Sequence, residues 1–112
     1  MTALPIIPDD PDHRIPFLLV LAESLHDAGY ATYSIEEALG AMAARLQLFG
    51  QYFVTPTSIF VSFGHPPTQQ TFMIRTEPKW PNLGKLVAVT ATARAVIQDK
   101  LTPAEGISRL LD

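Results

Sequence analysis

The feature of this sequence that most constrains its fold is a change, in the middle of the chain, in the type and spacing of its apolar side chains. Residues 51–63 (QYFVTPTSIFVSF) and 70–76 are rich in aromatic and β-branched residues, which is typical of strands. The segments on either side repeat apolar residues every three or four positions, as amphipathic helices do. We therefore predict an α+β fold with two N-terminal helices, a short antiparallel β-hairpin or sheet of two or three strands, and two C-terminal helices. These helices should pack on one face of the sheet, because their apolar stripes need a partner.

After Pro56 the strand-rich segment has two faces. Alternation places Ile59, Val61 and Phe63 on one face and Ser58, Phe60 and Ser62 on the other. Pro56 cannot donate a ladder hydrogen bond, so it marks an edge, a bulge or a strand start. Arg75 projects from the second strand, and the register decides whether it lies on the face of the two serines.

The N-terminal half carries two helical patterns. The first covers residues 16–28. The second is predicted to begin with a capping box, in which Ser34 is the N-cap and Glu37 its reciprocal partner. Phe49 belongs to the apolar stripe of this helix, and Gly50 should end it.

The C-terminal half also carries two helical patterns. Asn82 is a suitable N-cap for a helix that extends to about residue 100. The last helix has the clearest start in the chain, with Thr102 as N-cap, Pro103 as first residue and Glu105 as reciprocal partner.

The chain is predicted to hold a single α+β domain over residues 15–112. Residues 1–14 (MTALPIIPDDPDHR) contain three prolines and three aspartates and are expected to form a flexible lead-in. The longest uninterrupted apolar run, residues 17–22, is far shorter than the roughly 20 residues of a spanning helix. Because the chain stops at Asp112 inside an amphipathic pattern, a cut domain is as much expected as a complete protein.

Charge and composition exclude several classes of function. The net charge of −3 argues against a dedicated nucleic-acid binder, and the absence of cysteine excludes disulfides and thiolate chemistry. The three histidines are far apart in the sequence, so we expect no metal site and no cofactor. Residues 1–37 carry −6 and residues 38–112 carry +3. The positive part either forms solvated faces or faces an anionic surface such as lipid headgroups.

A group of polar residues near the strands could hold a small zwitterion. Arginine and a helix N-terminus would bind the carboxylate, and hydroxyls would orient the ligand. The alternative is structural: the asparagine only caps its helix, the arginine pairs with an acid such as Glu77, and the hydroxyls hold a bulge at Pro56. The candidate ligand-binding residues are Thr55, Thr57, Ser58, Ser62, Arg75 and Asn82.

A hydrolase of small amides or peptides is a second reading of the same hydroxyls. Ser58 or a threonine would be the nucleophile, and His26 or His65 would have to act as its base. No G-x-S-x-G elbow is present, so we assign no catalytic residue.

Several segments, taken in order, resemble the threonine/serine exporter family. They are DAGYATYSIEEAL (27–39), TPTSIFVSF (55–63), Arg75-Thr76, NLGKLVAV (82–89) and LTPAEGISRL (101–110). The resemblance is to the N-terminal domain of that family and covers residues 15–112. It implies a cytosolic domain that precedes membrane helices in proteins that export threonine and serine. The family-like polar residues are Thr55, Thr57, Ser58, Arg75 and Asn82, and the resemblance assigns them no role.

The resemblance leads to one functional expectation and two alternatives. We expect a soluble domain on the cytoplasmic side of the inner membrane, with a regulatory, substrate-sensing or assembly role and no enzymatic activity. Its partners would be the membrane-spanning part of the exporter, in the same or a separate chain, and threonine or serine, but no nucleic acid. The alternatives are the small hydrolase and a self-associating structural module that forms homo-oligomers.

Overall fold

The computed structural model describes residues 10–112. In this part of the chain, helices and strands follow one another in the order α1 (Arg14–Asp27), α2 (Thr32–Arg45), β1 (Gly50–Thr55), β2 (Ser58–Phe63), β3 (Gln70–Arg75), α3 (Leu83–Ile97) and α4 (Pro103–Leu111). This order confirms the predicted α+β fold with a helical pair on each side of a short sheet in the sequence.

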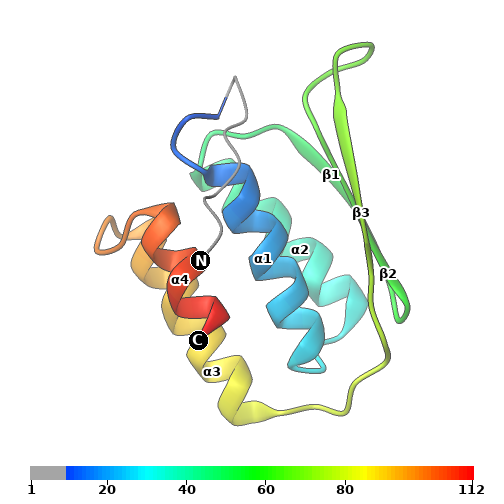
Figure 1. Ribbon diagram of the computed structural model, residues 1–112. Coiled ribbons are helices and arrows are strands. Elements are labelled where there is room, and N and C mark those ends of the chain that lie inside the picture. The colour runs from blue at the N-terminus through cyan, green and yellow to red at the C-terminus, as the bar shows by residue number, and fades with distance from the viewer. Residues whose placement is uncertain (1–9) are drawn as a thin grey trace.

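The elements form three layers (Figure 1). The sheet lies on one side, α1 and α2 pack against one of its faces, and α3 and α4 lie beyond them. The prediction that the helices pack on the sheet therefore holds for α1 and α2 only. The second pair packs on α1 instead, because α1 offers apolar side chains on both of its sides.

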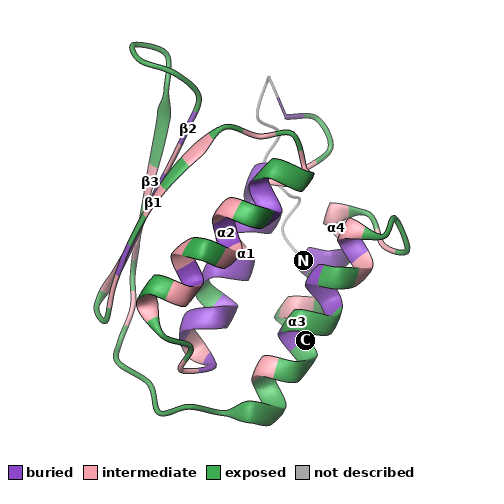
Figure 2. Ribbon diagram, turned by 180° about the vertical axis from the view of Figure 1, so that it is seen from behind, coloured by how far each residue is buried: buried purple, intermediate pink, exposed green. Residues whose placement is uncertain are grey.

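Helix α1 occupies the centre of the molecule and is buried along most of its length (Figure 2). Its sequence, RIPFLLVLAESLHD, is apolar around most of its circumference rather than along one stripe. A helix with this pattern is stable only when neighbours cover it on several sides. Phe17, Leu18, Leu21 and Ala22 are accordingly 0–1% exposed.

The sheet has the strand order β1-β2-β3, and both pairs are antiparallel. Pro56 lies in the two-residue turn between β1 and β2, so the proline ends one strand and precedes the next. Val54, Ile59 and Val61 point into the core, as alternation predicted for the last two. The opposite face of the sheet is not covered by the helices, all of which lie on one side (Figure 1).

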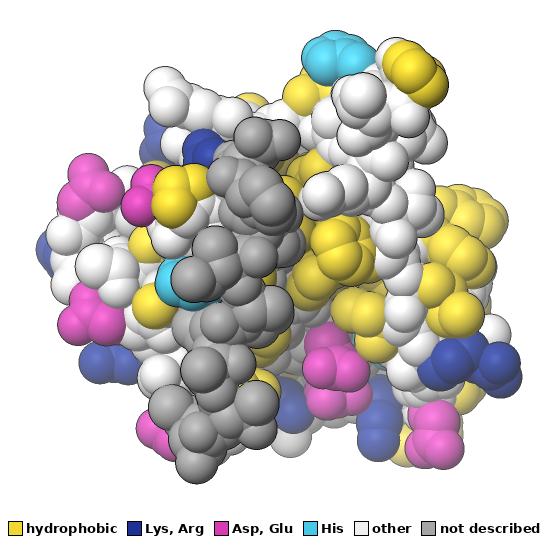
Figure 3. Space-filling view, turned by 45° about the horizontal axis from the view of Figure 1, so that its top comes forward, with side chains coloured by type: hydrophobic (Ala, Val, Ile, Leu, Met, Phe, Trp, Pro, Cys, Tyr) yellow, Lys and Arg dark blue, Asp and Glu magenta, His cyan; other side chains and the backbone are white. Residues whose placement is uncertain are grey.

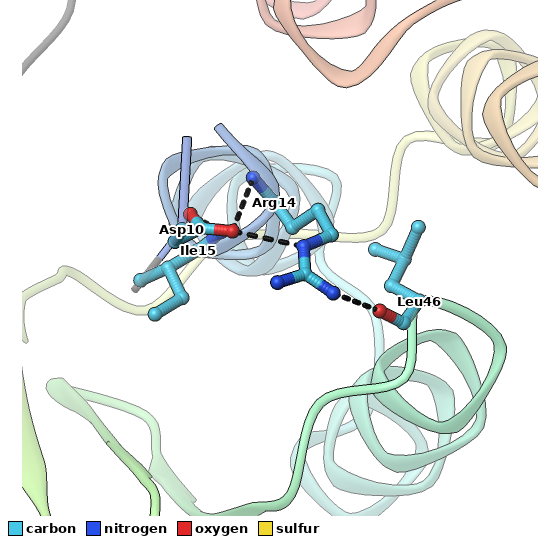
Figure 4. A network of polar contacts seen from close by, with 4 residues as sticks. All are labelled: Asp10, Arg14, Ile15 and Leu46. Carbon is cyan, nitrogen blue, oxygen red and sulfur yellow. Dashed lines mark hydrogen bonds and ion pairs between the residues drawn. The ribbon is translucent and has the colours of Figure 1, made fainter. Parts of the chain in front are cut away.

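The start of α1 is fixed by the buried carboxylate of Asp10 (Figure 4). It accepts hydrogen bonds from the first two helical amides, Arg14 N (3.1 Å) and Ile15 N (2.7 Å). The Arg14 side chain donates to Asp10 at 2.9 Å and to the carbonyl oxygen of Leu46, at the end of α2, at 2.7 Å. Of the lead-in expected over residues 1–14, residues 1–9 lie outside the described part, whereas residues 10–14 form this structured helix start.

Three expectations for the second helix are wrong. Ser34 is not its N-cap, because α2 begins at Thr32 after the N-cap residue Ala31, which makes no side-chain cap hydrogen bond. The helix ends at Arg45, five residues before Gly50, which begins β1. Phe49 is 52% exposed and stacks on His65 with ring centroids 4.1 Å apart. The first turns of this helix are held by tertiary contacts, since Ile35 is completely buried and Glu36 accepts a hydrogen bond from Val54 N.

The predicted starts of the last two helices are confirmed. The Asn82 side chain accepts from Lys85 N at 3.0 Å. Thr102 and Glu105 form the reciprocal capping box, with distances of 3.1 and 2.8 Å. The backbone N–H of Thr102 donates to the Glu105 carboxyl and lowers its pKa, because this hydrogen bond favours the charged form.

Two glycines permit close packing between elements. Gly29 ends α1 with a left-handed backbone (φ +74°), and a Cβ there would lie 2.5 Å from the carbonyl oxygen of Trp80. Gly106 brings α4 against α1 and α3, since a Cβ there would lie 2.8 Å from the Phe17 ring and 2.7 Å from Val96.

Candidate functional site

The candidate hydroxyls gather at the tight turn between β1 and β2. The hydroxyl groups of Thr55 and Ser58 hydrogen-bond each other at 2.7 Å. The backbone N–H of Thr57 donates to the Thr55 hydroxyl at 3.2 Å. Three of the candidate residues thus lie together, and the side-chain hydrogen bonds of Thr55 and Ser58 are made within the turn itself.

Arg75 joins this group through the register of the sheet. It lies directly opposite Ser58, so its side chain leaves the same outer face. Ser62 is on this face too, but it lies at the other end of β2, where it accepts a hydrogen bond from Thr71 at 3.1 Å. Among the described residues, Arg75 has no carboxylate within ion-pair distance, so the expected pairing with Glu77 is not formed.

Asn82 lies apart from the strand hydroxyls. Its backbone N–H donates to the carbonyl oxygen of Ala28 at 2.8 Å, and its side chain caps α3. Both contacts hold the segment after β3 against the end of α1. The cap is the contact that the structural alternative expects of Asn82.

His26, which the sequence suggested only as a possible base for a hydrolase, is a polar residue of the site that the set of candidate ligand-binding residues left out. It is 5% exposed, and its Nε2 lies 2.9 Å from the carbonyl oxygen of Thr55 and 3.1 Å from the hydroxyl of Thr76. The sequence feature that could have identified it is its position four residues after Ala22, which places it on the buried side of α1. His26 thus joins the end of α1 to the ends of β1 and β3.

The contacts of His26 decide what it can do chemically. A carbonyl oxygen only accepts hydrogen bonds, so Nε2 must carry the proton and donate it to Thr55. A protonated Nε2 cannot take a proton from the Thr76 hydroxyl, which itself lies 3.3 Å from the carbonyl oxygen of Pro56. This arrangement positions the turn and does not supply the base that the hydrolase interpretation needs.

The outer face of the sheet is arranged in rows across the strands. The middle row is apolar and consists of Phe53, Phe60 and Met73, which are 61%, 39% and 56% exposed. The rows on either side carry hydroxyl and amide groups, with Arg75 as their one charged residue. Hydrophobic side chains are prominent on the sheet side of the molecule, whereas charged side chains are frequent over α3 and α4 (Figure 3). We call the face of the sheet formed by the apolar middle row and the two rows beside it the outer sheet face.

Two polar cavities lie at the ends of the helices. The larger, of about 600 Å³, lies between the start of α1, the ends of α2 and α3, and the start of α4, and its lining mixes both signs of charge. The second, of about 470 Å³, is lined by Arg75 and Lys79 together with carboxylates such as Glu23. Over residues 10–112, no cluster of three or more histidine or carboxylate side chains could hold a metal ion.

One comparison with known proteins finds a match. The sequence model of a family described as "Putative threonine/serine exporter" (ThrE) matches residues 16–112. No curated protein and no solved structure matches the chain. Within the described residues, none of the helices has both the length and the apolar character that crossing a bilayer requires.

Proposed function

We propose that this chain, which belongs to the threonine/serine exporter family, is a non-enzymatic part of an exporter that acts from the cytoplasmic side of the membrane. Its role is to assemble with the membrane-spanning part, in the same or a separate chain, and to gate export. The observation that carries the proposal is the family match, which extends over nearly all of the described structure.

The outer sheet face supports the assembly role. An apolar row flanked by hydroxyl and amide groups has the composition of a protein contact surface, with an aromatic centre and a polar rim. Exposed aromatic side chains on a sheet are a common place for such contacts, because their burial releases ordered water. We therefore assign the contact with the membrane-spanning part to Phe53, Phe60 and Met73.

Threonine export from living cells tests this proposal. The gene for this chain is deleted in its natural host, and efflux of threonine and serine is measured after loading the cells with threonine- or serine-containing dipeptides. Deletion should lower efflux, and the wild-type chain should restore it. Phe60→Asp should fail to restore it, whereas the control Ser108→Asp, on the exposed side of α4, should succeed. Unchanged efflux after deletion would contradict the proposal.

Substrate sensing is a second candidate role, favoured by the register that places Arg75 opposite Ser58. The guanidinium would bind the carboxylate of threonine or serine, and the neighbouring hydroxyls would bind its polar side chain. Calorimetric titration with millimolar threonine should give heat that Arg75→Gln abolishes. Absence of heat with both amino acids would contradict sensing and leave assembly and gating.

A further inference from the structure

A groove of about 390 Å³ runs between α2 and α3, with α1 as its floor. The helices that form it can be followed in Figure 2. Its apolar lining comprises Leu21 and Leu25 from α1, Ala38 and Met42 from α2, and Ala93 and Ile97 from α3. The alanine side chains on the two walls are small and fill little of the space above the floor. The volume lies within the range of about 300–1,000 Å³ that is usual for small-molecule sites.

The charged side chains that line this groove have a single sign. Arg45 lies in the last turn of α2 and Arg94 in the last turn of α3, and both line the groove. The ends of these two helices also line a common neighbouring cavity, so the last turns that carry the two arginines lie towards the same end of the groove. Gln98 adds a neutral amide there.

Among residues 10–112, no acidic side chain lines the groove beside these arginines. The described lining contains no Asp or Glu, although the whole chain has 11 acids against 8 lysines and arginines. Within residues 10–112, neither Arg45 nor Arg94 forms an ion pair. The carboxyl ends of α2 and α3 each contribute only about half a negative charge, so two full positive charges outweigh them.

We propose that this groove binds a small amphiphile with an aliphatic body and a carboxylate head. The body would lie on Leu21 and Leu25 between the alanine-rich walls, where its burial provides most of the affinity. The head would lie between Arg45 and Arg94, whose guanidinium groups match a carboxylate through paired hydrogen bonds. A cationic amphiphile is excluded by repulsion at that end. The proposal does not depend on the role of the chain in export.

Titration of the full chain with decanoate, below its micellar concentration, tests the proposal by calorimetry and by amide shifts in NMR spectra. We expect saturable one-to-one binding with shifts centred on α2 and α3. Decanol should bind about tenfold or more weakly because it lacks the charge, and decylamine should bind more weakly still.

Variants separate the head site from the body site. Arg45→Gln with Arg94→Gln should weaken decanoate binding about tenfold or more and leave decanol binding unchanged. Ala41→Leu, at an exposed position on the groove wall, should weaken both ligands. The control Arg109→Gln, on α4, should bind decanoate like the wild type.

Several results would overturn the proposal. They are the absence of saturable decanoate binding, equal affinity for decanoate and decylamine, and indifference of binding to the double arginine variant. Shifts of the same amides with protein concentration alone would assign the groove to a second copy of the chain and would overturn it as well.

Discussion

At the scale of single residues, Asp10 takes part in a network that joins the start of α1 to the end of α2, 32 residues further along the chain. Its carboxylate satisfies two amides at the start of α1 and pairs with Arg14, which in turn reaches Leu46 at the end of α2. The negative group lies at a helix N-terminus and the positive group at a helix C-terminus, so both charges complement the helix dipoles.

Replacing Asp10 tests this arrangement. Asp10→Asn should lower the free energy of unfolding by about 1.5–3 kcal/mol, because hydrogen bonds to a charged acceptor are replaced by weaker ones and Arg14 loses its partner. Asp12→Asn, which changes an exposed carboxylate two residues away, should alter it by less than about 0.5 kcal/mol. Urea unfolding at pH 7 measures both. Equal effects of the two changes would contradict the role given to Asp10.

Tyr52 makes the stability of the folded protein depend on pH in the alkaline range. Burial raises the pKa of its phenol from 10.0 to about 12, and none of the described residues hydrogen-bonds its hydroxyl. The folded state holds the phenol proton more tightly than the unfolded state. Stability from this residue is therefore constant below pH 10 and is lost as the pH rises from 10 towards 12.

Tyr52→Phe should remove this loss. We expect the variant to be as stable as the wild type at pH 8, or more stable by about 1 kcal/mol, because an unpaired buried hydroxyl is deleted. Between pH 8 and pH 11 its urea midpoint should fall less than that of the wild type. Tyr33→Phe, at a phenol that is 66% exposed, is the control and should follow the wild type. A parallel fall in all three proteins would refute the assignment.

At the scale of elements, helix starts show how far local sequence signals reach. The side chains of Thr102 and Glu105 each accept a hydrogen bond from the backbone N–H of the other residue, which is only three positions away. Their capping box could therefore be predicted from the local sequence. The same signature at Ser34 and Glu37 failed, because α2 makes a longer-range contact instead. The neighbouring Glu36 accepts a hydrogen bond from Val54 N at 2.8 Å, and no local pattern encodes that partner.

The contact between Glu36 and Val54 closes the outer edge of β1. Glu36→Ala should lower the free energy of unfolding by about 1–3 kcal/mol, since the Val54 amide then lacks an acceptor. It should also speed hydrogen exchange of the Val54 amide. Glu37→Ala, at the adjacent exposed position, should change neither property beyond about 0.5 kcal/mol. Unaltered exchange at Val54 in the Glu36 variant would show that the edge is held by other contacts.

At the scale of the whole molecule, the candidate site could be predicted only in part. Alternation along β2 placed Ser58 and Ser62 on one face, and the register then brought Arg75 to it. His26 was considered only as a possible base, and its contacts with Thr55 and Thr76 could not be predicted because these partners are 29 and 50 residues away in the chain. The order of the layers was missed for a similar reason, since both sides of α1 are apolar and the sequence does not say which element covers each.

Gly106 tests the packing of α4 on the other layers. Gly106→Ala should lower the free energy of unfolding by about 1–3 kcal/mol, because a methyl group there overlaps Phe17 and Val96. Gly40→Ala, in α2, should instead raise it by about 0.5–1 kcal/mol, since a Cβ there meets no atom within 4 Å and alanine favours helices. Thermal and urea unfolding measure the two signs. The same sign in both variants would contradict the close approach at Gly106.

The contact of α1 with α4 also has a consequence for biosynthesis. Phe17 is completely buried, and part of its cover is Gly106, which the ribosome adds much later. At the usual pace of translation, the nascent chain exposes this ring for on the order of 5–20 s before the segment that shields it can emerge. Native packing around the first helix thus waits until α4 has been synthesised, and chaperones have a defined window in which to bind.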